Sequence, residues 1–134
     1  MNACVLDTDV VIAALDRRDS HHHAAAKSLR ALIEQEIALL LSLINYAETL
    51  VKPAENEQTL RTAIDAIATL GIKLIAPTPA IARDAARYRT LNISLADGFA
   101  LATAEAHKAT LASFDRRVRR ALPHAGLELN QILA

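Results

Sequence analysis

Four short apolar runs, separated by longer stretches with helical periodicity, are the feature that most limits how this chain can fold. The runs cover residues 3–6, 37–41, 72–75 and 109–114. Each has the length of a buried strand, and between them apolar side chains recur every three or four residues, as on one face of a helix. This order predicts an α/β fold with three layers, α/β/α, around a central, mainly parallel sheet of four to five strands.

Local signals indicate where several of the helices begin and end. Ser42 is a suitable N-cap for a helix that continues through Glu48, and Gly71 is a suitable stop for a helix over residues 55–70. We expect Asp97 to open a helix of small residues, 98–104, that can approach a neighbouring backbone closely. A tail at residues 127–130 could add a short final strand. An earlier helix has apolar residues at helical spacing, namely Ala25, Leu29, Leu32 and Ile33.

Length, composition and charge restrict the class of protein. The 134 residues predict one domain, and 52% apolar residues are enough to bury a core. Cys4 is the single cysteine, so an intrachain disulfide is impossible, and its place in an apolar run favours a small buried side chain. The absence of a signal-type core or a long apolar stretch leads us to expect a soluble, cytoplasmic protein without membrane contact.

Four acidic residues stand where a strand or loop gives way to a helix, and they come from separate parts of the chain: Asp7, Glu48, Asp97 and Asp115. In an open parallel sheet, ligands bind beyond the carboxyl ends of the strands, so Asp7 and Asp115 could meet there. Each acid alone could simply cap a helix. Glu48 has mostly apolar neighbours in sequence, where an ionised group needs a partner. Crowded carboxylates repel, and a hard divalent cation such as Mg²⁺ or Mn²⁺ would reverse that repulsion.

Positive charge is unevenly distributed along a chain that carries 15 basic and 15 acidic residues. A cluster follows Asp115, and arginine outnumbers lysine by 11 to 4, which suits phosphate recognition because the guanidinium fork can bind two oxygens. The alternative is an ordinary solvated helix face. The histidine run 21–23 could suggest zinc, but consecutive side chains diverge, so we interpret it as a solvated helix entrance. The candidate residues for binding phosphate groups of a nucleic acid are Arg116, Arg117, Arg119 and Arg120.

Four segments together resemble the motifs of PIN-domain ribonucleases, and most closely those of VapC-like toxins from type II toxin-antitoxin pairs. The segments are residues 5–13 (VLDTDVVIA), 42–50 (SLINYAETL), 95–104 (LADGFALATA) and 111–115 (LASFD). Any one of these motifs is weak evidence, but the four occur in order at the usual spacing and span nearly the full length. The resemblance implies a single PIN domain over residues 1–134.

The resemblance also implies a site and an activity. Asp7, Glu48, Asp97 and Asp115 would be the metal-binding and catalytic acids, with Thr8 and Ser113 as supporting polar residues. Asp9 stands where the family often has Asn or Ser, so it would either tune metal affinity or cap a helix. The implied activity is Mg²⁺- or Mn²⁺-dependent endonucleolytic cleavage of RNA. The implied partners are a VapB-like antitoxin and a second copy of the chain, as a homodimer.

Two alternatives compete with the nuclease interpretation. A PIN-like domain could act without catalysis as a binding or regulatory protein, although an aromatic content of 3% offers little for stacking single-stranded bases. The sequence from Asp7 to Val11 also fits the Asp-x-Asp motif of haloacid-dehalogenase-like phosphatases, in which the first Asp attacks phosphorus. That fold needs a longer chain and a late pair of acids. The sequence does not identify the RNA, the number of metal ions or the dimer surface.

Overall fold

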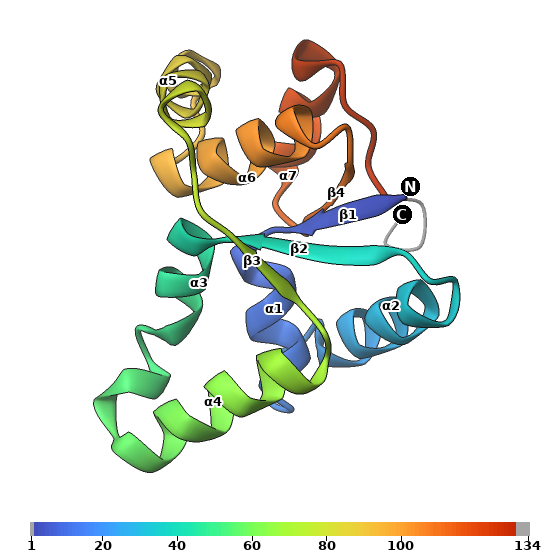
Figure 1. Cartoon of the computed structure of the whole chain (residues 1–134), viewed down its shortest axis with the longest axis vertical. Helices are drawn as coiled ribbons and strands as arrows, with labels where there is room; N and C mark the ends of the chain where they lie inside the picture. The colour runs from blue at the N-terminus through green and yellow to red at the C-terminus, as the bar shows by residue number, and fades with distance from the viewer. Residues whose placement is uncertain (1, 131–134) are drawn as a thin grey trace.

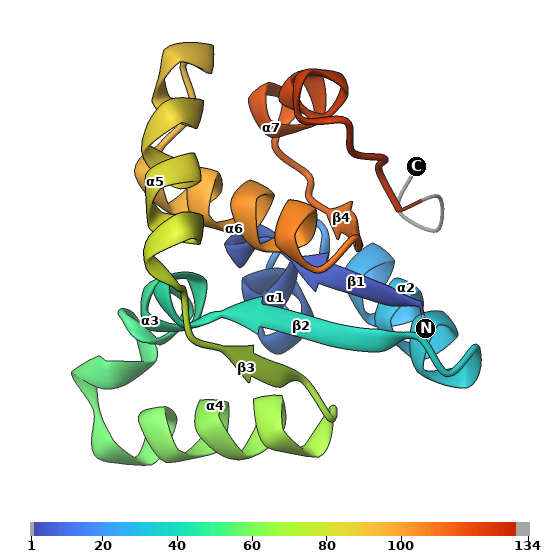
Figure 2. The ribbon, with the colours of Figure 1, turned by 45° about the horizontal axis from the view of Figure 1, so that its top comes forward.

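The computed structural model describes residues 2–130 and has the predicted three layers (Figures 1 and 2). The strands are β1 (Ala3–Leu6), β2 (Ala38–Ser42), β3 (Lys73–Ile75) and β4 (Thr110–Ala112). The α-helices are α1 (Thr8–Leu15), α2 (His22–Glu34), α3 (Leu43–Leu50), α4 (Glu57–Thr69), α5 (Pro79–Arg87), α6 (Leu95–Ala106) and α7 (Arg116–Ala121). Three 3₁₀ helices join them: η1 (Pro53–Glu55), η2 (Tyr88–Leu91) and η3 (Leu122–Ala125).

The sheet is entirely parallel among its four strands, in the order β3-β2-β1-β4. β1 is central, and its Val5 pairs with Leu40 of β2 and Leu111 of β4. The expected final strand is reduced to an isolated bridge between Leu111 and Leu129, so the sheet has the lower of the two predicted strand numbers. Because all four strands point the same way, their carboxyl ends share one edge of the sheet.

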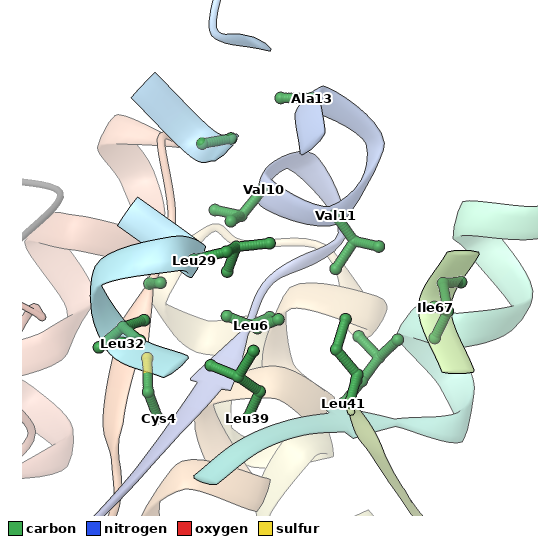
Figure 3. Packing of buried hydrophobic residues seen from close by; sticks show 13 residues of the cluster. Cys4, Leu6, Val10, Val11, Ala13, Leu29, Leu32, Leu39, Leu41 and Ile67 are labelled. Atoms are coloured by element: carbon green, nitrogen blue, oxygen red, sulfur yellow. The ribbon is translucent and has the colours of Figure 1, made fainter. Parts of the chain in front are cut away.

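Successive side chains of β1 and β2 point to opposite faces of the sheet and pack into a separate core on each face. On one face Leu6 and Leu41 pack against α1, α2 and α4, as Figure 3 shows for Val10, Leu29 and Ile67. On the other face Val5 and Leu40 pack against residues of α6 and α7. Period-two alternation in strands buried on both sides explains why these runs are apolar throughout.

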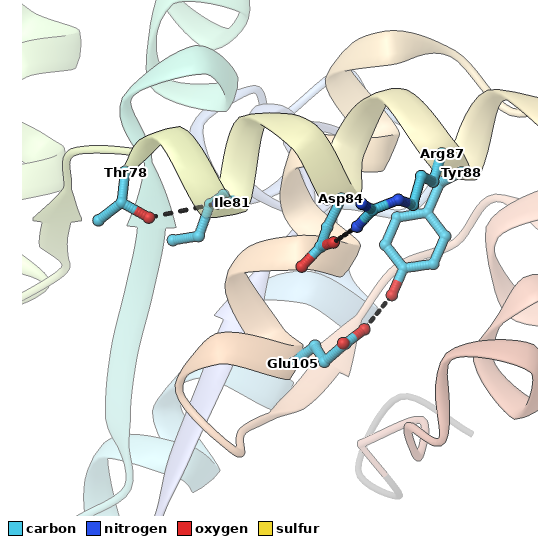
Figure 4. A network of polar contacts seen from close by, with 6 residues as sticks. All are labelled: Thr78, Ile81, Asp84, Arg87, Tyr88 and Glu105. Carbon is cyan, nitrogen blue, oxygen red and sulfur yellow. Dashed lines mark hydrogen bonds and ion pairs between the residues drawn. The ribbon is translucent and has the colours of Figure 1, made fainter.

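α5 does not touch the sheet core directly but packs on α6, and Gly98 permits this approach. A Cβ atom at Gly98 would lie 2.7 Å from the backbone oxygen of Ala85. The expectation of a small-residue helix in close backbone contact is therefore confirmed. Polar contacts surround the pair of helices (Figure 4): Thr78 caps α5 by accepting from the Ile81 amide, and the Tyr88 hydroxyl donates to the Glu105 carboxylate.

Most of the helix ends described in the sequence are confirmed, whereas the start of α6 and the exposure of one residue in α2 differ from the prediction. Ser42 caps α3 through the Ile44 amide at 3.3 Å, and Gly71, with a φ of +74°, follows α4, as predicted. The predicted start of α6 was wrong by three residues, because the N-cap is Ser94, which accepts from the Asp97 amide at 3.1 Å. Ile33 was expected on the inner stripe of α2 but is 44% exposed. None of the described helices has the length and apolarity needed to cross a bilayer.

Candidate functional site

Asp7 lies immediately beyond the central strand β1, at the edge of the sheet where the strands end. Its amide donates to Ala112 O of β4 at 2.9 Å, which ties it to the neighbouring strand. One carboxylate oxygen accepts from the Thr8 amide at 2.9 Å and caps α1, and the other accepts from the Ser113 hydroxyl at 2.7 Å. Both oxygens are held, so the position of this carboxylate is fixed by the fold.

Burial makes the Asp7 carboxylate costly to ionise. The residue is 1% exposed. Burial is the largest influence and raises the pKa of Asp7 well above its usual value, and the negative charges of Asp9 and Asp97 raise it further. Hydrogen bonds from Ser113 and Thr8 act in the opposite direction but are weaker influences. A nearby positive charge would favour the ionised form of this carboxylate.

Asp9 joins the same negative region from the first turn of α1. One of its oxygens accepts from the Phe114 amide at 3.1 Å, and the other, Oδ1, is buried without a hydrogen-bond partner within residues 2–130. Burial first, and then the charges of Asp115 and Asp97, raise the pKa of Asp9 to about 6, against a lowering by the Phe114 amide. A partnerless buried oxygen beside other carboxylates is a potential cation ligand. The N-cap of α1 is Asp7, so the capping alternative for Asp9 is wrong, and its effect on metal affinity stays a prediction.

Glu48 approaches the site through a hydrogen-bonded chain that includes a residue the sequence did not single out. Thr8 donates from its hydroxyl to Glu48 Oε1 at 2.6 Å. Asn45, which is fully buried, donates from Nδ2 to Thr8 Oγ1 at 3.0 Å and to Ala96 O at 3.1 Å. Asn45 precedes Glu48 by one helical turn, a spacing that could have identified it. It connects α1, α3 and α6 beside Asp97.

The burial argument for Glu48 was wrong. Its side chain is exposed, and Val51, one of the apolar neighbours on which that argument relied, is 69% exposed. The apolar side chains near Glu48 do not surround its carboxylate, because some of them face the solvent. Glu48 reaches the site through the Thr8 hydroxyl and not because a buried charge requires a partner.

Asp115 caps α7 and is linked to Asp7 through Ser113. Its carboxylate accepts from the amides of Arg117 at 2.8 Å and Val118 at 3.3 Å, so the expected capping role is present. Its own amide donates to the Ser113 hydroxyl at 3.1 Å, and that same hydroxyl donates to Asp7. Ser113 therefore couples the ends of β1 and β4.

An aromatic stack supports this loop from α2. The ring of His21 lies on Phe114 with centroids 4.2 Å apart and an interplanar angle of 12°. The next histidine, His22, has Nδ1 2.8 Å from Ala13 O. The run lies at the start of α2, where His21 and His23 are exposed and His22 is half-buried, so the interpretation as a solvated helix entrance is confirmed, and the structure adds these two contacts to it. Sequence gave no signal for the stack, since nearly a hundred residues separate its members.

The fold gathers the acids at one sheet edge but does not assemble a closed metal site. Within the described residues, no three histidine, cysteine, aspartate or glutamate side chains lie close enough together to hold a metal ion. Like charges without a counter-ion stay apart. The residues nonetheless fit a hard divalent cation, because every donor is an oxygen and Asp9 has an unpartnered buried one. Asp7, Glu48, Asp97 and Asp115 as ligands stay a prediction.

A parallel three-layer α/β/α fold with acidic side chains at the carboxyl edge of its sheet defines the class of this protein. The model of the PIN domain family matches residues 4–121, so the chain belongs to the PIN domain family. The resemblance noted in the sequence is confirmed at the level of the family. Comparison with curated protein sequences gave no match.

Solved structures have the same fold over most of their length. FitAcB from Neisseria gonorrhoeae is 23% identical, with a TM-score of 0.71 over 96% of this chain and 97% of that chain. VapBC2 from Rickettsia felis, bound to a promoter DNA fragment, is 18% identical, with a TM-score of 0.75 and the same coverages. VapC20 from Mycobacterium tuberculosis, a sarcin-ricin loop cleaving toxin, is 16% identical, with a TM-score of 0.71 over 89% and 95%. At these identities the likeness establishes the fold.

Proposed function

We propose that this protein is a metal-dependent endoribonuclease that hydrolyses RNA phosphodiester bonds. The observation that carries the proposal is Asp7, a fully buried carboxylate whose pKa is raised by burial and by the charges of Asp9 and Asp97. Negative groups concentrated in this way favour a divalent cation and its phosphate ligand. Family membership favours this nuclease interpretation over the phosphatase one.

Different residues of the chain would bind the cation, orient the carboxylates and contact the RNA. Asp7, Glu48, Asp97 and Asp115 would hold Mg²⁺ or Mn²⁺. When bound, the cation supplies the positive charge that activates a water molecule and stabilises the leaving oxygen. The hydrogen bonds from Ser113 and Thr8 orient the Asp7 oxygens. The arginines that follow Asp115 would supply counter-charge for the RNA backbone.

The test is cleavage of RNA by the purified chain with Mg²⁺ or Mn²⁺, and with a chelator as the negative control. Asp7→Asn and Asp97→Asn should each abolish cleavage, because each removes a charge from the cation site while preserving side-chain shape. Asp65→Asn, at an exposed acid of α4, is the matched control and should cleave like the wild type. Cleavage at the wild-type rate by either site variant would refute the proposal.

A non-catalytic PIN-like binding protein is the second candidate. One observation favours it: no group of three potential ligands is preassembled within the described residues. The two candidates differ in the same experiment, because a binding protein would retain RNA without cutting it. Metal-dependent product formation by the wild type, lost in Asp7→Asn, would exclude the non-catalytic alternative.

We further propose that the chain is the toxin of a VapBC-type pair, acting in the cytoplasm as a homodimer and blocked by a VapB-like antitoxin. The support is the fold shared with structures described as toxin-antitoxin complexes, including one from Klebsiella pneumoniae with 24% identity and a TM-score of 0.69. Expression of the chain alone should arrest growth, and expression of Asp7→Asn should not. Coexpression with a cognate VapB-like antitoxin should relieve the arrest.

A further inference from the structure

The arginines after Asp115 do not form one uniform basic surface. Arg119 is turned toward the protein and donates from Nε to Ser113 O at 2.8 Å, which anchors the loop that carries Asp115. Arg117 and Arg120, one helical turn apart on α7, line a cavity together with His124 of η3. The spacing of three residues places Arg117 and Arg120 on one face of α7, and η3, which follows directly, adds His124 to the same cavity. The structure therefore separates a structural arginine from two that share a cavity.

The cavity has a volume of about 260 Å³ and no acidic residue in its lining. Its lining residues are Leu91, Asn92, Arg117, Arg120, Ala121 and His124. Pockets for drug-sized ligands have volumes of about 300 to 1,000 Å³, so this cavity suits a single charged group better than a nucleoside.

The two cavity arginines have no carboxylate partner among the described residues, unlike Arg87, which pairs with Asp84 at 2.5 Å. Within residues 2–130, the side chain of Arg120 makes one long hydrogen bond, from Nε to Arg116 O at 3.4 Å. Like charges one helical turn apart destabilise each other unless an anion joins them. A phosphate group would do so, because the guanidinium fork matches its oxygens.

The wall opposite α7 is fixed by the protein itself. Asn92 has a left-handed backbone with a φ of 60°, and its amide donates to Arg89 O at 3.1 Å. Arg89 in turn donates from Nη1 to Ile93 O at 2.5 Å, so this arginine is occupied in holding the turn. Asn92 therefore lines the cavity from a loop that hydrogen bonds hold in place. Preorganisation of this kind reduces the cost of binding an anion.

We propose that this cavity binds one backbone phosphate of the RNA, at a position flanking the bond that is cleaved. The location supports this, because the Arg117 amide donates to the Asp115 carboxylate at 2.8 Å, which places the cavity arginines on the helix that begins at the acidic site. The inference rests on the proposed ribonuclease function and adds a separate anion site to it. One phosphate contacts both arginines.

The experiment measures binding without cleavage, in the full-length Asp7→Asn chain with a chelator present. The probe is a fluorescent single-stranded RNA with a 5′-hydroxyl, titrated by anisotropy between about 50 and 200 mM salt. Each phosphate neutralised on a single strand contributes about 0.7 to the slope of log affinity against log salt. The double variant Arg117→Gln/Arg120→Gln should lower that slope by about 0.7, because both side chains serve one phosphate. Two independent contacts would lower it by about 1.4, and that result would overturn the shared site.

Controls separate a defined site from general positive charge. Each control is made in the Asp7→Asn chain. Arg61→Gln, at an exposed arginine of α4, should leave the slope of log affinity against log salt unchanged. Arg116→Gln should change this slope less than Arg117→Gln or Arg120→Gln does. Equal effects of Arg116→Gln and Arg117→Gln would indicate a diffuse basic surface and overturn the proposal. A second RNA with a 5′-phosphate tests the source of the anion, because sensitivity to Arg120→Gln confined to that RNA would indicate a terminal phosphate instead.

An independent probe is inorganic phosphate, titrated into ¹⁵N-labelled protein. Amide shifts should concentrate at Asn92, Arg117 and His124, and Arg120→Gln should abolish them. If the wild type cleaves RNA normally with metal while the double variant keeps an unchanged salt slope, that combination would refute the phosphate site but not the proposed ribonuclease function. Absence of both cleavage and RNA binding in the wild type would refute the proposed function as well.

Discussion

Replacing Asp9 with asparagine should stabilise the metal-free protein, although it removes a residue of the candidate site. Asparagine can still accept the 3.1 Å hydrogen bond from the Phe114 amide through its side-chain oxygen. The substitution removes a charge whose pKa is raised to about 6 by burial and by the charges of Asp115 and Asp97. A pKa raised by about two units from 3.8 corresponds to about 3 kcal/mol. Water still reaches part of this carboxyl, so we expect about 1 to 2 kcal/mol.

The raised pKa of Asp9 determines the direction in which the stability of the wild type changes with pH. The folded-state pKa of Asp9 lies above the unfolded-state value, so the folded protein holds the proton more tightly. The wild type therefore has its full stability below about pH 4 and loses this contribution as the pH rises from about 4 to about 6. Asp9→Asn does not lose this stability as the pH rises. The difference in free energy of unfolding between Asp9→Asn and the wild type should therefore be near zero at pH 4 and reach its full value above pH 7.

The assay is urea unfolding of both proteins in chelator across that pH range. Addition of Mg²⁺ at pH 8 should stabilise the wild type more than Asp9→Asn, because only the wild type carries the fifth carboxylate. An advantage of Asp9→Asn that does not vary with pH, or a loss of stability at pH 8, would refute the electrostatic reasoning.

Two further substitutions test the packing that positions the site. Gly98→Ala should lower the free energy of unfolding by about 1 to 3 kcal/mol, measured by urea unfolding, because the new Cβ would lie 2.7 Å from Ala85 O; an unchanged stability would show that α5 can move away without cost. His21→Ala should cost about 0.5 to 1.5 kcal/mol and speed hydrogen exchange of the Phe114 amide, whereas His21→Phe should preserve both values by keeping the stack; equal behaviour of the two variants would remove the stack from the account.

Much of the fold was predictable because its causes are local. Strands such as residues 3–6 are short apolar runs, and helix ends at Ser42 and Gly71 use side chains or backbone conformations that act within a few residues. The start of α6 was misplaced because Ser94 and Asp97 can both begin a helix, and the hydrogen bond to Ser94 decided between them. The local pattern Ser94-x-x-Asp97 resembles a capping box and favours Ser94 as the N-cap, as observed.

The acidic residues of the candidate site could be named from the sequence, but the hydrogen bonds and ring contacts that support them could not. The order of the strands brings Asp7 and Asp115 to one edge, which follows from a parallel sheet. The contacts of Asn45 and His21 depend on partners far away in sequence, Ala96 and Phe114, so a local pattern such as the spacing of Asn45 from Glu48 could indicate the residue but not its partner. The basic cluster was similarly ambiguous, because residue type does not say which arginine faces the protein.

Diffraction from crystals grown with Mn²⁺ tests the central claim most directly, because the anomalous signal of manganese locates the ion independently of the protein coordinates. We predict an anomalous peak between the carboxylates of Asp7 and Asp97, with Glu48 or Asp115 completing the oxygen ligands and the acids drawn closer together than in the metal-free fold. Manganese bound elsewhere, or no peak at this edge of the sheet at saturating Mn²⁺, would contradict the account.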